Sequence, residues 1–271
     1  MFAAVSIMFE FHTDKERYFQ MQYDNASKYV IPFIEKVFPL QKDFRVLEIG
    51  CGEGGVLKAF LDRGCSGVGV ELSESRTELA RKFLAEYFAN RKVELYAKDI
   101  YDLSFAELFF HSFDLIVLKD VIEHIPNQEH IIPQLNNYLK KDGKFFFGFP
   151  PWYMPFGGHQ QIAKNKLLAA VPYYHLLPAP LYKMILKIFG EKEITITDLM
   201  DVKKTGISIE RFEKIIRNSG LKVDDKKFYF INPIYSYKFG WKPRTQSKII
   251  SAIPYLRDFF TTAVFYLVSE N

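Results

Sequence analysis

The residues best suited to chemistry in this chain are four glycines within six positions, in the segment EIGCGEGG at residues 48–55. An apolar run precedes them, and a helix-like pattern follows at residues 56–61. Because glycine lacks a Cβ atom, such a turn can adopt positive φ angles and lets a ligand lie against backbone N–H groups at a helix start. The segment therefore predicts a site for a nucleotide-type cofactor.

Two cofactor patterns fit this glycine turn. Gly50, Gly52 and Gly55 satisfy the G-x-G-x-x-G of dinucleotide-binding folds, which is weak evidence by itself. The alternative, E-x-G-x-G-x-G, runs through Glu48, Gly50, Gly52 and Gly54. Glu71 closes the next predicted strand about twenty residues after the turn, where a carboxylate can accept both hydrogen bonds of a ribose diol. This spacing suits both cofactor classes, so the turn alone leaves the choice open.

The segment FDLIVLKDVIEHIP at residues 113–126 favours the second pattern. It closely resembles the region around strand four of class I S-adenosylmethionine-dependent methyltransferases, including the pair Glu123 and His124. The glycine turn resembles motif I of that family, and the resemblance covers residues 41–150. The sequence is similar to those of quinone-biosynthesis and other small-molecule O-methyltransferases. The resemblance implies S-adenosylmethionine as cofactor and S-adenosylhomocysteine as product.

The resemblance also assigns roles to single residues. Glu71 would meet the ribose, Asp99 and Ile100 the adenine, and the backbone near Leu118 the methionine part. The full set of expected cofactor-binding residues is Glu48, Gly50, Gly52, Gly54, Glu71, Leu72, Asp99, Ile100 and Leu118.

Two histidines are candidates for the catalytic base. An imidazole with a pKa near 6.5 can accept a proton from an attacking hydroxyl or amine, although His124 could equally brace the turn beside Glu123. His159 belongs to the aromatic loop at residues 150–161, which leaves the carboxyl end of a predicted strand, where ligands bind in open α/β sheets. Trp152 and Gln160 of this loop are candidates for contacting the methyl acceptor. The alternative is a proline-braced structural loop.

The elements that must position these residues alternate between strands and helices. Strands are predicted near residues 44–49, 68–72, 92–96, 113–118, 144–149, 221–231 and 261–268. We expect an α/β fold with a doubly wound, seven-stranded, mostly parallel sheet, whose last strand is antiparallel beside the fifth, as in the resembled family. Residues 1–40 would form an N-terminal helical lid and residues 41–150 the cofactor-binding core, with residues 206–271 completing the sheet.

Residues 151–205 are expected to form a helical cap over the acceptor site, with short helices at 167–171, 173–177 and 181–189 between prolines. The apolar surface of this cap could line a pocket for a bulky acceptor, mediate a dimer, or touch a membrane surface through Lys183, Lys187 and Lys192. The sequence does not choose among these partners.

Composition limits the remaining function classes. The formal net charge of +4 is far below the dense positive charge that a dedicated nucleic-acid-binding protein carries on one face. The composition therefore does not indicate nucleic acid as a partner. Cys51 and Cys65 form no disulfide framework, and no residues show metal-ligand spacing, so we expect no metal. The apolar residues 1–11 resemble neither a signal peptide nor a spanning helix, which predicts a cytoplasmic protein.

The sequence therefore predicts a methyltransferase that acts on an oxygen of a small or lipid-like molecule, with nitrogen as the weaker alternative. Two rival hypotheses remain. One is an NAD(P)-dependent oxidoreductase, which the glycine spacing and Glu71 also permit. The other is a cofactor-binding protein that keeps the fold without catalysis.

Overall fold

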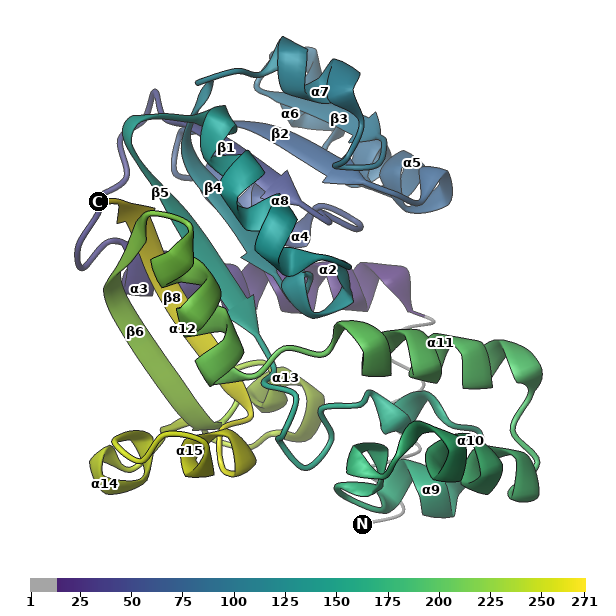
Figure 1. Ribbon diagram of the computed structural model, residues 1–271. Coiled ribbons are helices and arrows are strands. Elements are labelled where there is room, and N and C mark those ends of the chain that lie inside the picture. The colour runs from purple at the N-terminus through teal and green to yellow at the C-terminus, as the bar shows by residue number, and fades with distance from the viewer. Residues whose placement is uncertain (1–13) are drawn as a thin grey trace.

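The computed structural model describes residues 14–271, and its centre is one eight-stranded sheet (Figure 1). The strand order is β3-β2-β1-β4-β5-β8-β6-β7. Strands β1 to β5 pair in parallel, whereas β8 is antiparallel to both β5 and β6. The strands are β1 (Arg45–Ile49), β2 (Ser66–Glu71), β3 (Val93–Ala97), β4 (Phe113–Lys119), β5 (Leu139–Phe149), β6 (Leu221–Ile231), β7 (Arg244–Thr245) and β8 (Ala263–Glu270).

This sheet confirms the predicted α/β architecture, including the antiparallel strand beside the fifth. The predicted count of seven strands is exceeded by one, because two residues at the far edge pair with β6 and form β7. Residues 1–13 of the predicted lid lie outside the described residues.

Helices cover both faces of the sheet because consecutive strand residues point in opposite directions. In β4, Leu115 packs with Phe33 and Phe60 of one helical layer, whereas its neighbour Ile116 packs with Ile132 and Phe212 of the other. The helices of these layers and of the β3 edge are α2 (Lys15–Asn25), α3 (Ile31–Ile34), α4 (Gly55–Leu61), α5 (Glu74–Phe83), α6 (Ala85–Ala89), α7 (Leu103–Leu108), α8 (Gln128–Leu135) and α12 (Ile209–Asn218).

The region between β5 and α12 forms a separate helical lobe, seen in green at the lower right of Figure 1. Its helices are α9 (Lys166–Ala170), α10 (Ala179–Ile188) and α11 (Glu193–Thr205), which share an apolar cluster of their own. The short predicted helices are present, and α11 is a longer helix that the sequence pattern did not resolve. The lobe is tied to the core where the Thr205 hydroxyl donates to the carbonyl of Glu123 at 2.6 Å.

One boundary differs from the prediction. The fifth strand was predicted near residues 144–149, but α8 ends at Leu135 and β5 already begins at Leu139. The backbone at Asp142 and Gly143 forms an irregularity inside β5, where the register with β4 shifts. Asp142 adopts a φ of +66° there, which lets the strand pair with β4 on both sides of the irregularity.

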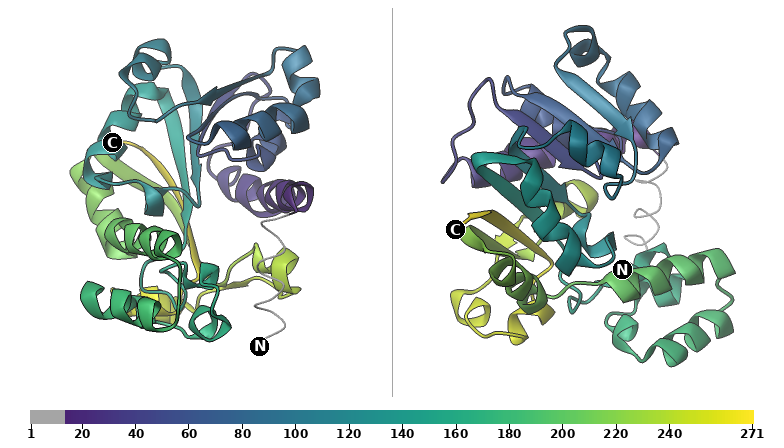
Figure 2. Two further views of the ribbon diagram at one scale, coloured as in Figure 1. Left: turned by 90° about the vertical axis from the view of Figure 1, so that its right-hand side faces the viewer. Right: turned by 45° about the horizontal axis from the view of Figure 1, so that its top comes forward.

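A long connection at residues 232–262 joins β6 to β8 and contains α13 (Tyr235–Phe239), α14 (Lys248–Ser251) and α15 (Leu256–Phe259). It begins at the edge where the parallel strands end, because β6 runs in the same direction as β5. Figures 1 and 2 show it at the same end of the molecule as the helical lobe. Among the described residues, no helix is long and apolar enough to cross a membrane.

Candidate functional site

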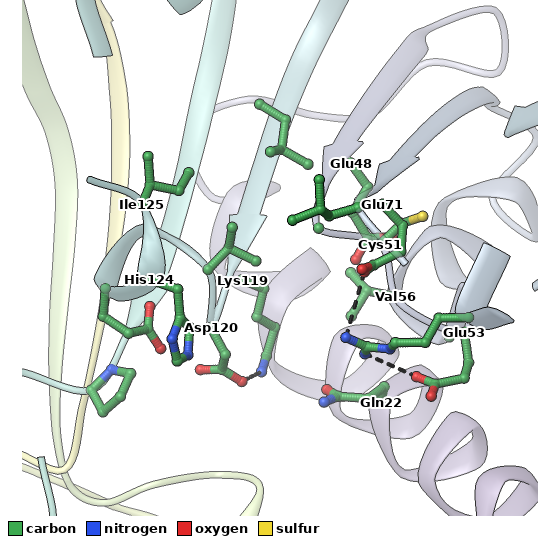
Figure 3. Close-up of a pocket in the computed structure, with 18 of the residues that line it drawn as sticks. Gln22, Glu48, Cys51, Glu53, Val56, Glu71, Lys119, Asp120, His124 and Ile125 are labelled. Atoms are coloured by element: carbon green, nitrogen blue, oxygen red, sulfur yellow. Dashed lines mark hydrogen bonds and ion pairs between the residues drawn. The ribbon is translucent and has the colours of Figure 1, made fainter. Parts of the chain in front are cut away.

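A cavity of about 820 Å³ lies at the carboxyl ends of β1, β2 and β4. Its walls come from the glycine turn, the segment after β4, the loop after β5, and the helices α2 and α13. Figure 3 shows Lys119, Asp120 and His124 across the cavity from Glu48 and Glu71. The fold therefore joins the predicted cofactor end and the predicted catalytic end in one space.

The glycine turn has the predicted backbone. Gly50, Gly52 and Gly54 adopt φ angles of +68°, +54° and +85°, which L side chains rarely adopt. Gly55 serves a different purpose, because a Cβ there would lie 2.5 Å from the carbonyl oxygen of Phe19 in α2. Gly50 and Gly55 line the cavity, whereas Gly52 and Gly54 shape the turn behind it.

Glu71 lies at the end of β2 and faces the cavity, as predicted. Its two oxygens accept the backbone N–H groups of Gly52 and Ser73, each at 3.0 Å. The guanidinium of Arg76 lies 3.5 Å from the same carboxylate and 3.1 Å from Glu53. Glu71 thus holds the turn in place while its remaining lone pairs stay available to a ligand.

Arg76 and Glu53 belong to the site although no motif identified them. Glu53 also pairs with Lys15 of α2 at 3.0 Å, so one chain of charges connects α2, the glycine turn and α5. Burial raises the pKa of Glu53, but Arg76 and Lys15 together hold it below its ordinary value. The carboxylate is therefore ionised and anchors α2 beside the cavity.

Glu48 is buried in the cavity wall, and its Oε2 has no hydrogen-bond partner. Burial raises the pKa of this carboxyl well above its ordinary value. A buried polar atom without a partner is costly unless a ligand or water satisfies it. Glu48 therefore offers an unused polar atom at the position where the resemblance places the cofactor.

The next group of expected cofactor-binding residues lies just after β2 and β3. Leu72, Asp99 and Ile100 all line the cavity, and Asp99 accepts the N–H of Tyr101 at 3.0 Å. At the end of β4, where the backbone near Leu118 was expected to meet the methionine part, the Leu118 side chain is buried in the sheet and the next residue, Lys119, lines the cavity.

His124 and His159 are brought together from different elements, with ring centroids 4.8 Å apart. Both line the cavity. Burial lowers the pKa of His124, and burial followed by the nearby His124 lowers the pKa of His159 to about 3. Both rings are therefore neutral near pH 7 and retain a nitrogen that can accept a proton or bind a cation.

Glu123 adds a carboxylate to the two histidines. It is buried, neither of its oxygens has a hydrogen-bond partner among residues 14–271, and burial raises its pKa well above the ordinary value. One ligand atom from each of Glu123, His124 and His159 lies within 4.8 Å of the others. Such a donor set can hold a divalent transition metal. The expectation of no metal rested on spacing along the chain, which could not reveal a group assembled by the fold.

The placement of Trp152 and Gln160 argues against the expectation that they contact the acceptor. Neither lines the cavity. Gln160 is fully buried and donates to the carbonyl of Pro155 at 2.9 Å, while Trp152 packs edge-on against His175. Both residues brace the loop after β5. Two other residues of this loop, Phe156 and His159, line the cavity.

Sequence reasoning missed several lining residues that come from distant segments. Tyr18 and Gln22 of α2 lie on one side, and Tyr235 and Lys238 of α13 lie on another. The sheet topology brings the end of β6, and with it α13, to this edge. None of the lining residues belongs to α9, α10 or α11.

A family model described as a methyltransferase domain matches residues 20–171. Curated relatives include two ubiquinone biosynthesis O-methyltransferases. The protein from Neisseria meningitidis serogroup C is 32% identical over 133 residues, which are 47% of this chain and 53% of the relative. The protein from Idiomarina loihiensis is 32% identical over 103 residues, which are 38% and 41% of the two chains. The chain thus matches about half the length of these relatives or less.

Solved structures support the fold. The geranyl diphosphate C-methyltransferase from Streptomyces coelicolor aligns with a TM-score of 0.57 at 12% sequence identity, over 89% of this chain and 80% of its own. At this level of identity, the similarity concerns the arrangement of the sheet and helices.

Proposed function

The chain belongs to the methyltransferase domain family, and we propose that it transfers a methyl group from S-adenosylmethionine to an oxygen of a small or lipid-like molecule. The similarity to curated O-methyltransferases supports oxygen as the acceptor atom, with nitrogen as the weaker alternative. The family match gives no support to the oxidoreductase that the glycine spacing had left open.

One observation carries this proposal. Glu71 and the glycine turn line the same cavity as His124 and His159. Methyl transfer requires the donor and the nucleophile to be aligned in one space, and such alignment supplies much of the acceleration. A cavity of about 820 Å³ is near the upper end of the range for ligand pockets, which leaves room for an acceptor beside a cofactor.

The residues of the cofactor end fit S-adenosylmethionine, which supplies an electrophilic methyl group on a sulfonium when bound. Glu71 would hold the ribose, Asp99 the adenine, and the Oε2 of Glu48 a polar group of the methionine part. The fit rests on the donor set and on the buried Oε2 of Glu48, which has no partner in the described protein.

At the acceptor end, we assign the base to His124. His124 is exposed and lines the cavity, whereas His159, in the loop after β5, is half-buried. A neutral imidazole beside the acceptor can remove a proton from the attacking hydroxyl as charge develops. His159 would then orient the His124 ring through their close packing.

The unpartnered oxygens of Glu123 support a second role for the same cluster. A divalent cation held by Glu123, His124 and His159 would lower the pKa of an acceptor hydroxyl and orient it. Activity that survives dialysis against a chelator assigns His124 the role of base. Activity that is lost on chelation and restored by added zinc or cobalt, but not by magnesium, assigns the cluster to cation binding.

The proposed function is tested by two measurements on the full chain. Calorimetry should show binding of S-adenosylhomocysteine and none of NAD. Incubation with methyl-labelled S-adenosylmethionine and a cell extract should then yield a labelled small molecule, whose mass spectrum identifies the acceptor. Binding without any labelled product would favour a cofactor-binding protein that lacks catalysis, and binding of NAD alone would refute the proposal.

A further inference from the structure

The connection between β6 and β8 has an unusual charge pattern. Residues 232–257 contain no Asp or Glu, although they include the basic residues Lys238, Lys242, Arg244, Lys248 and Arg257. Lys242, Arg244 and Lys248 are exposed, and none of these three forms an ion pair with a carboxylate of the described residues. The outer part of the connection therefore carries positive charge that nothing in the described chain neutralises.

The same segment exposes large apolar and aromatic side chains. Trp241, Ile249 and Tyr255 are 53%, 77% and 70% exposed, and Ile253, Leu256 and Phe260 are each more than 40% exposed. Single exposed apolar residues are common, but this many within twenty positions of one connection leave apolar surface that calls for a partner. Tryptophan and tyrosine beside cations are typical of protein surfaces that lie in the headgroup region of a bilayer.

This surface is held firmly against the core. The guanidinium of Arg257 is buried and pairs with Glu210 at 2.9 Å and Glu213 at 3.0 Å, both on α12. The N–H of Tyr255 also donates to Glu210 at 2.9 Å, and this residue has a φ of +64°. A non-glycine residue in the left-handed region persists only where its surroundings enforce it. The part of the connection around Tyr255 is therefore fixed against α12.

The helical lobe offers a less suitable surface. Met184 and Ile188 of α10 are exposed, but the neighbouring Lys183 and Lys187 lie 3.8 Å and 3.6 Å from the carboxylate of Glu193. Those lysines therefore have a local counter-ion. Charge complementarity to an anionic partner thus favours the connection over the lobe.

We propose that residues 241–256 dock on a bilayer surface that carries anionic lipids. The basic residues Lys242, Arg244 and Lys248 attract the headgroups, and Trp241, Ile249 and Tyr255 insert at the interface. The adjacent helix α13 lines the cavity through Tyr235 and Lys238, so docking brings the acceptor end close to the bilayer. Delivery of a lipid-like acceptor rests on the proposed function, whereas docking itself does not.

Flotation of the full chain with lipid vesicles tests the docking. At about 0.1 M salt, the protein should float with phosphatidylcholine vesicles that contain about 30% phosphatidylglycerol, and not with phosphatidylcholine alone. The triple variant Lys242→Gln/Arg244→Gln/Lys248→Gln should lose about 100-fold in binding. Trp241→Ser/Ile249→Ser/Tyr255→Ser should also release the protein. The matched control in the lobe, Lys183→Gln/Lys187→Gln/Lys192→Gln, should float like the wild type.

Three results would overturn the docking surface. In the first, the wild-type protein does not float with anionic vesicles. In the second, the lobe control loses as much binding as the charge variant. In the third, light scattering shows that the wild type is a dimer and that the apolar variant is a monomer. The last would assign the apolar surface to a second copy of the chain. Calorimetry with S-adenosylhomocysteine measures whether each variant still binds the cofactor product. It therefore tests the proposed function separately from the membrane docking. A chain that floats but transfers no methyl group refutes the function and leaves the surface standing.

Discussion

Glu71 links the fold to the ligand at the scale of a single residue. Its carboxylate accepts two backbone N–H groups and so fixes the glycine turn against β2. The same side chain faces the cavity where the ribose is expected. Glu71 therefore has a structural role in the turn and an expected role in ligand binding. For this reason, an acidic residue at the end of the second strand indicates a cofactor site.

Replacing Glu71 should weaken cofactor binding. Glu71→Ala removes charge-assisted hydrogen bonds to the ribose and leaves the N–H groups of Gly52 and Ser73 without their acceptor. We expect a loss of about 2 kcal/mol, roughly 30-fold in the dissociation constant of S-adenosylhomocysteine. Calorimetry measures this, and Glu74→Ala on the exposed start of α5 is the matched control. Unchanged affinity would remove Glu71 from the site.

The histidine pair should affect turnover more than cofactor binding. His124→Ala is expected to lower kcat by about 100-fold, because the acceptor loses its proton acceptor or its cation ligand. His159→Ala should lower kcat less, since it acts through the neighbouring ring. His130→Ala on the exposed side of α8 is the control and should change neither quantity. Full activity in His124→Ala would refute the assignment of the base.

At the scale of elements, the close approach of α2 and α4 builds one wall of the cavity. Gly55 begins α4, and its missing Cβ makes room for the backbone of Phe19 and Tyr23 in α2. Because α2 also carries Tyr18 and Gln22 into the cavity, the spacing of these helices decides how the cofactor is covered.

Gly55→Ala should separate the two helices. Its Cβ would lie 2.5 Å from a backbone carbonyl oxygen, which cannot rotate away as a side chain can. We expect a loss of about 1–3 kcal/mol in the free energy of unfolding, measured by urea denaturation, together with weaker binding of S-adenosylhomocysteine.

Gly190→Ala separates backbone strain from this steric effect. Gly190 has a φ of +76° but no heavy atom within 4 Å of its Cβ position, and it lies outside the cavity lining. This variant should lose about 1 kcal/mol of stability and keep its cofactor affinity. Equal affinity in both variants would show that the spacing of α2 and α4 does not matter for binding.

At the scale of the whole molecule, a buried carboxyl pair joins α15 to α12 and so ties the β6–β8 connection to the core. Asp258 is fully buried and accepts the N–H of Ile209 at 3.1 Å. Burial, and then the neighbouring Glu210, raise the pKa of Asp258 to about 8. Asp258 is therefore protonated over much of the neutral range and can donate to Glu210.

This pair predicts stability that falls as the pH rises. An unfolded Asp titrates near 3.9, so between that value and about 8 the folded chain binds more protons than the unfolded chain. The free energy of unfolding should decrease across this window, because Asp258 loses its proton on unfolding and this release becomes more favourable as the pH rises.

Asp258→Asn should remove this part of the pH dependence. The amide keeps an acceptor for Ile209 and a donor for Glu210 without carrying a titrating proton. We expect the variant to be more stable than the wild type at about pH 8, with the difference shrinking toward pH 4, by urea denaturation. Asp198→Asn on the exposed face of α11 provides the baseline. Parallel pH profiles for wild type and Asp258→Asn would contradict the assignment.

The sequence by itself determined the features that depend on local order. Strand, glycine turn and helix follow one another at residues 45–61, and Glu71 closes the next strand, because hydrophobic periodicity and glycine torsions are properties of neighbouring residues. The α/β architecture, the cofactor class and the cofactor end of the site follow from that order and from the family resemblance.

Only the tertiary structure decided which distant residues meet. The pairing of His124 with His159 and the unpartnered carboxyl of Glu123 depend on how the loop after β5 packs, and Gln160 turns away to brace that loop. The contribution of α13 depends on β6 ending at the same edge as β5. Such contacts are set by sheet topology and side-chain packing, which spacing along the chain does not encode.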